Sequence, residues 1–149
     1  MPATEDIVSP ANSQPAGAAA ASASRVEALV AGLGAPYGRE RSLKLVPGAV
    51  LAERLLLSVH VFHLGPKPAR ALAGMTAALG MPEAFAAPVA AALGEAEVVH
   101  LGFEGGPDGA LYKLYLERVR PVRAVLRGEA PGPALAHLAF KWQPGAPRH

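Results

Sequence analysis

Val98-Val-His-Leu-Gly-Phe-Glu104 and Leu111-Tyr-Lys-Leu-Tyr-Leu-Glu-Arg118 are two runs in which an apolar side chain occupies every second position. Gly105-Gly-Pro-Asp-Gly109 lies between them, and Pro-Asp-Gly is typical of a type I turn followed by a glycine at positive φ. The two runs therefore predict an antiparallel β-hairpin. Residues two apart share a face of a strand, so one face of the hairpin should belong to the core: Val99, Leu101, Phe103, Tyr112, Leu114 and Leu116.

Outward from this hairpin, the chain predicts short elements separated by glycine and proline. Ser24-Arg-Val-Glu27 has the form of a capping box, so a helix should begin at Ser24. Residues 49–56 fit either two helical turns or the start of a strand. The remaining predicted elements are strands at 42–46, 55–64 and 135–142 and helices at 68–80, 82–94 and 120–127. This order predicts an α+β fold, in which a mainly antiparallel sheet of about four to five short strands carries two to four helices on one face.

Composition limits the possible classes of function. The 149 residues suit one domain, and 51% of them are hydrophobic, which is enough for a core. The absence of cysteine excludes disulfides, thiol catalysis and zinc–thiolate sites. No apolar run reaches the roughly 18 residues of a membrane helix, and the acidic pair Glu5-Asp6 argues against a secretory signal. We therefore expect a cytoplasmic protein that has no membrane partner.

The two ends of the chain differ in composition from its middle. Residues 1–21 are rich in Ala, Pro and Ser and are predicted to be a disordered tail. Residues 22–143 are predicted to form a single α+β domain. Because the chain ends soon after an amphipathic strand, this domain is alternatively the front half of a larger one. Residues 144–149 are predicted to be a polar C-terminal end.

A polar face is predicted on the side of the sheet opposite the core. It collects His100, Glu104, Lys113, Tyr115, Glu117, His137 and Lys141 from three strands, if these strands are neighbours. A solvated antiparallel sheet alternates in this way without any further function. However, imidazole and phenol groups suit proton transfer and hydrogen bonding better than mere solvation. The candidate catalytic residues are therefore His100, Tyr115 and His137, and the candidate ligand-binding residues on this face are Lys113, Glu117 and Lys141.

A second candidate lies in the basic last quarter of the chain. Residues 1–110 carry 7 Lys/Arg against 10 Asp/Glu, whereas residues 111–149 carry 7 against 2. Arg120, Arg123 and Arg127 would form one stripe on a helix, and guanidinium groups in a row suit phosphate or carboxylate. Their neighbours are Pro, Val and Leu rather than aromatic residues, so a nucleic-acid partner is not expected.

Metal and cofactor sites are not predicted. His60 and His63 would lie on opposite faces of a strand and could not chelate one ion together. The sequence indicates no particular cofactor.

The sequence therefore predicts a small protein that binds a phosphate- or carboxylate-bearing molecule on the polar sheet face, as a biosynthetic enzyme or part of one. The alternative is a non-catalytic accessory subunit whose apolar patch is covered by a second copy or by another protein. Whether the protein is an enzyme is left open by the sequence.

Overall fold

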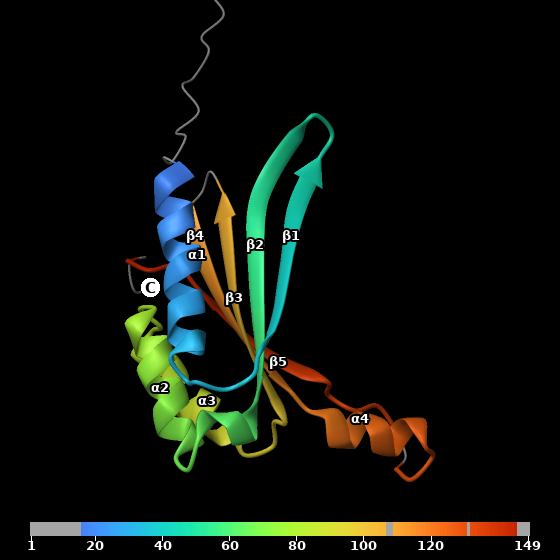
Figure 1. Ribbon diagram of the computed structural model, residues 1–149. Helices are drawn as coiled ribbons and strands as arrows, with labels where there is room; N and C mark the ends of the chain where they lie inside the picture. The colour runs from blue at the N-terminus through green and yellow to red at the C-terminus, as the bar shows by residue number, and fades with distance from the viewer. Residues whose placement is uncertain (1–15, 107–108, 131, 146–149) are drawn as a thin grey trace, which may run out of the picture.

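Five antiparallel strands form one sheet in the order β1-β2-β3-β4-β5, and three helices cover one of its faces (Figure 1). The computed structural model describes residues 16–106, 109–130 and 132–145. The α+β fold predicted from the sequence is confirmed. In chain order the elements are α1 (Ala16–Ala31), β1 (Gly38–Val46), β2 (Ala49–His60), η1 (Val61–Leu64), α2 (Pro68–Ala78), η2 (Glu83–Phe85), α3 (Ala86–Leu93), β3 (Val98–Gly106), β4 (Gly109–Glu117), α4 (Val119–Leu126) and β5 (His137–Trp142).

The core lies between the sheet and the helices α1, α2 and α3 (Figure 1). Leu114 is fully buried at its centre and pairs in register with Leu101 on β3 and Phe140 on β5. The indole Nε1–H of Trp142 donates a hydrogen bond of 2.9 Å to the carbonyl oxygen of Leu79, which ties β5 to the end of α2. All six apolar residues predicted for the inner face of the hairpin are buried: Val99, Leu101, Phe103, Tyr112, Leu114 and Leu116.

Helix α1 begins at Ala16, so the predicted start at Ser24 is wrong. Ser24 lies inside the helix, because the Ala-rich residues before it have high intrinsic helix propensity. Of the predicted disordered segment 1–21, residues 16–21 belong to α1, and residues 1–15 lie outside the described residues. Of the predicted polar end 144–149, residues 146–149 also lie outside them.

Strand β2 differs from its prediction at both ends. It begins at Ala49, directly after the tight turn at Gly48 (φ 78°), so the helical alternative for residues 49–56 is wrong. Pairing with β1 on one side and β3 on the other satisfies its backbone groups as a strand. The strand ends at His60 rather than at residue 64, because the chain turns into η1 on its way to α2.

No helix in the described part of the chain is both long enough and apolar enough to cross a bilayer.

Candidate functional site

The helices α1, α2 and α3 cover the apolar face of the sheet (Figure 1), so the polar face lies on the opposite side. The register places all seven predicted residues on it, because His100 lies opposite Tyr115, Glu117 opposite His137, and Lys113 opposite Lys141. The face also extends onto β2, since Ser58 lies opposite His100 and Arg54 opposite Glu104. The seven residues were predicted to share this face. The sequence did not predict that Lys44, Arg54 and Ser58 also belong to it.

His100 is the centre of a hydrogen-bonded chain across three strands. Its Nδ1 atom bonds to the hydroxyl oxygen of Ser58 at 2.8 Å, and its Nε2–H donates to Oε2 of Glu117 at 2.9 Å. The His100 side chain is 15% exposed and that of Glu117 is 31% exposed, so the chain is partly withdrawn from water. The exposed ring of His137 lies beside it, with its centroid 6.1 Å from that of His100.

This chain contains a hydroxyl, an imidazole and a carboxylate, the groups of an acyl-transfer triad. Ser58, however, lies near the end of β2 at a position that is still paired on both sides, with Gly38 on β1 and His100 on β3, so the neighbouring backbone N–H groups are engaged in the sheet. Acyl transfer needs free donors close to the nucleophile to hold the developing oxyanion. The arrangement therefore suits proton transfer and ligand binding on an open surface better than attack by Ser58.

Glu104 is surrounded by three cations and is largely buried, with 13% of its side chain exposed. It pairs with the ammonium of Lys113, with Nε of Arg54 at 3.1 Å and with Nζ of Lys44 at 3.5 Å. The hydrogen bond from Lys113 lowers the pKa of Glu104 to about 2, against the opposing effect of burial and with help from the three positive charges. Lys113, which was predicted to hold a ligand, is therefore already paired with a carboxylate.

Lys141 is the cation of this face that has no ion-pair partner among the described residues. It is exposed on β5 and lies directly opposite Lys113, so two like charges face each other across adjacent strands. On the same face of β5, the small residue Ala139 separates Lys141 from His137 and lies opposite Tyr115. The small, exposed Ala139 therefore has an ammonium, a phenol and an imidazole as its neighbours on this face.

The three predicted arginines lie on and just after α4, which extends from the ends of β4 and β5, apart from the other helices (Figure 1). Arg120 Nε pairs with Oε1 of Glu97 at 2.7 Å, and Arg127 pairs with Glu129 at 3.8 Å. Arg123 is exposed. Two of the three guanidinium groups are thus paired with carboxylates, and the structure does not bring the stripe together with His100.

Glu97 also holds the first turn of α4. Its carboxylate accepts hydrogen bonds from the backbone N–H groups of Val119 and Arg120, which are unpaired at a helix start. Burial raises the pKa of Glu97, but the side-chain hydrogen bond from Arg120 and the two backbone hydrogen bonds outweigh it and lower the pKa overall. The position of α4 thus depends on an ionised carboxylate.

His60 and His63 are arranged differently from their prediction. His60 ends β2 and His63 lies in η1, so the two rings are not on opposite faces of one strand. Their centroids are 6.1 Å apart in an edge-to-face arrangement, and the ring of Phe62 contacts both.

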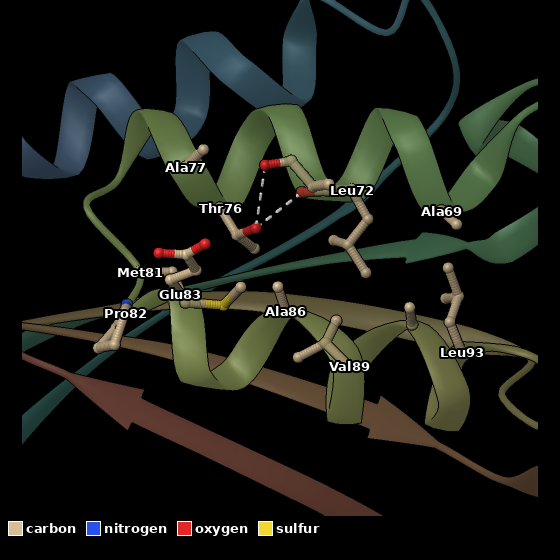
Figure 2. Close-up of a pocket in the computed structure, with 12 residues that line it drawn as sticks. Ala69, Leu72, Thr76, Ala77, Met81, Pro82, Glu83, Ala86, Val89 and Leu93 are labelled. Carbon is tan, nitrogen blue, oxygen red and sulfur yellow. Dashed lines mark hydrogen bonds between the residues drawn. The ribbon is translucent and has the colours of Figure 1, made fainter.

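A cavity of about 270 Å³ lies between α2 and α3 (Figure 2). Its walls are almost entirely apolar, and Glu83 is the charged residue at its lining. The hydroxyl of Thr76 donates to the carbonyl oxygens of Leu72 (3.0 Å) and Ala73 (3.2 Å), so its hydrogen is already used within α2. Because ligand sites combine apolar walls with several convergent polar groups, the sheet face is the better candidate.

Comparisons of the chain with models of protein families, with curated proteins and with solved structures found no match. The function is therefore inferred from the residues of the sheet face.

Proposed function

We propose that the protein binds a small anionic molecule, bearing a carboxylate or a phosphate, on the polar face of the sheet. One observation supports this most directly. Lys113 and Lys141 lie opposite each other on adjacent strands, and of these two lysines Lys113 is the one that pairs with Glu104. Like charges directly opposite each other destabilise a sheet, and an anion placed next to Lys141 would remove that cost.

The residues around Lys141 suit the rest of such a ligand. Ala139, which lies between Lys141 and His137 on this face, has a small side chain, and Tyr115 lies opposite it on β4. Lys141 and His137 are four residues apart on one strand, which corresponds to roughly 13 Å. That length fits a small metabolite whose anionic group binds Lys141 and whose polar groups reach Tyr115 and His137.

The test is a thermal-shift titration of the full chain with inorganic phosphate, pyrophosphate and citrate, at low salt and with EDTA present. Lys141→Met removes the charge and keeps the length of the side chain, and Lys67→Met is the matched control, since Lys67 is exposed and precedes α2. At a ligand concentration of about 100 times Kd, binding should raise Tm by roughly 5–10 °C. The rise should be kept in Lys67→Met and lost in Lys141→Met. An equal rise in all three proteins would place the anion elsewhere and refute the proposal.

Acid–base catalysis by His100, Tyr115 and His137 stays a prediction. So does the cytoplasmic location.

Self-association is a second candidate function, favoured by the exposed apolar residues. Among the residues whose exposure the structure describes, four of the seven exposed large hydrophobic side chains lie near the turn of the β1–β2 hairpin: Leu43 (57%), Leu45 (63%), Val46 (41%) and Val50 (57%). All nine residues of β1 are exposed, and this strand forms an edge of the sheet. Unpaired strand edges are templates for pairing with another chain, so we propose a second copy as the partner.

Light scattering across a range of protein concentrations tests this second candidate. We expect a dimer that Leu45→Lys converts to a monomer. A native chain that is monomeric at every concentration would exclude self-association.

A further inference from the structure

The geometry points to a binding site for a divalent transition-metal ion, with Zn²⁺ as the reference ion, formed by His100, Glu117 and His137. One nitrogen of each histidine and one carboxylate oxygen of Glu117 all lie within 4.8 Å of one another. They come from β3, β4 and β5, and the register explains their meeting. Glu117 lies directly opposite His137, and His100 lies diagonally across from Glu117.

The ligand set determines the class of metal. Two imidazole nitrogens and one carboxylate oxygen are typical of zinc sites that keep one position open, and of related first-row metals. Mg²⁺ and Ca²⁺ prefer a shell made of oxygen atoms, so they should bind weakly here. The open position would face solvent above the sheet and would take water or an anionic group.

Ser58 supports this interpretation from the opposite side of the His100 ring. A metal-binding histidine nearly always donates its second N–H to a neighbouring acceptor, which fixes both the tautomer and the ring orientation. The hydroxyl of Ser58 is 2.8 Å from Nδ1 of His100, so it can accept that hydrogen bond. Metal binding would displace the proton that Nε2 of His100 donates to Glu117, and the lone pair of Nε2 would then be directed toward the ion.

Little movement is needed to complete the site. Zn–N distances of about 2.0–2.1 Å place ligand atoms roughly 3.3 Å apart around a tetrahedral ion, which is closer than the 4.8 Å limit seen here. His100 and Glu117 are partly buried and already hydrogen-bonded to each other. His137 is exposed on the edge strand β5, so rotation of its side chain can close the remaining gap.

The experiment is a calorimetric titration of the full-length chain, free of any affinity tag and stripped of metal with EDTA that is then removed, with Zn²⁺ and separately with Mg²⁺. We expect one Zn²⁺ per chain and no measurable binding of Mg²⁺. Co²⁺ serves as a spectroscopic probe, and visible absorption typical of low-coordinate Co²⁺ should appear at the same stoichiometry. His100→Gln and His137→Gln should weaken Zn²⁺ binding about 100-fold or more. Ser58→Ala, which removes only the supporting hydrogen bond, should weaken it about tenfold.

His60→Gln is the matched control, because His60 is exposed on β2 and its substitution has the same chemistry. This control should bind Zn²⁺ like the native chain. His137→Gln removes an exposed side chain and should fold normally, so it keeps the test valid if His100→Gln does not fold. Absence of Zn²⁺ binding, or equal binding by the native chain and His137→Gln, would overturn the proposal. The metal site does not rest on the anion proposal, which is tested with EDTA present, so either can fail alone.

Discussion

Replacing Glu104 by glutamine should destabilise the protein in a pH-dependent way. The substitution keeps the shape of the side chain but leaves Lys44, Arg54 and Lys113 close together without their shared anion. The pKa of Glu104 is about 2 in the folded protein, against an ordinary value of 4.5. Because the folded-state pKa is lowered, the stabilisation by the carboxylate is fully present above about pH 4.5 and is lost as the pH falls toward 2.

The size of the expected loss in the free energy of unfolding follows from how exposed the three partners of Glu104 are. Lys44 and Arg54 are 47% and 40% exposed, and ion pairs of such exposure contribute about 1 kcal/mol or less each. Lys113 is only 14% exposed, and its charge-assisted hydrogen bond contributes more, although a glutamine oxygen can still accept from it. Together these effects predict a loss of about 1–2 kcal/mol near neutral pH.

Urea unfolding followed by tryptophan fluorescence at pH 7, 5, 4 and 3 measures this loss, since Trp142 is buried against the core. Glu40→Gln is the control, because Glu40 is exposed and lies on the same face of β1 as Lys44. This substitution should lower the free energy of unfolding by less than about 0.5 kcal/mol. The difference between the native chain and Glu104→Gln should shrink steadily from pH 5 to pH 3. A difference that is below 0.5 kcal/mol at pH 7, or that does not change with pH, would refute the assigned role of Glu104.

Two further predictions concern the core and α4. Leu114→Ala should lower the free energy of unfolding by about 3 kcal/mol, because Leu114 is fully buried and a cavity would remain. Leu126→Ala, the same change at a residue that is 80% exposed, should cost less than about 0.5 kcal/mol, and equal costs would contradict the assigned core face. Glu97→Gln should destabilise the first turn of α4 by about 1 kcal/mol, seen as faster amide exchange in residues 119–126. Because the pKa of Glu97 is lowered from 4.5, the native chain should show the same loosening as the pH falls below that value, and unchanged exchange would exclude the capping role.

The hairpin and its core face could be predicted because alternation at period two has one structural meaning once the turn is recognised. The same alternation is enough to place His100, Lys113, Tyr115 and Glu117 on one face. The start of α1 could not be predicted in this way, because a run of alanines has helix propensity but no apolar periodicity.

The partners of the site residues depend on pairings between distant strands. Ser58 and Arg54 reach His100 and Glu104 only because β2 pairs with β3, although α2 and α3 lie between these strands in the sequence. In the sequence, Arg54 and Ser58 alternate with Leu55 and Leu57, which are buried, and this local pattern indicates the face on which they lie. The register that aligns Arg54 and Ser58 with β3 could not be predicted, because residues so far apart in the chain leave no local pattern.

Glu104 on β3 and Glu117 on β4 differ in how many partners their carboxylates have, and this difference predicts which of the two binds a ligand. Glu104 forms ion pairs with three cations, so its charge stabilises the sheet face. Glu117 is bonded only to His100 among the described residues and lies next to the exposed His137. Glu117→Gln should therefore weaken Zn²⁺ binding at least tenfold while changing stability by less than about 1 kcal/mol. Glu104→Gln should do the reverse, lowering stability while leaving Zn²⁺ affinity unchanged. If both variants lost Zn²⁺ affinity equally, the whole polar face would act through its general charge rather than through a defined set of ligands.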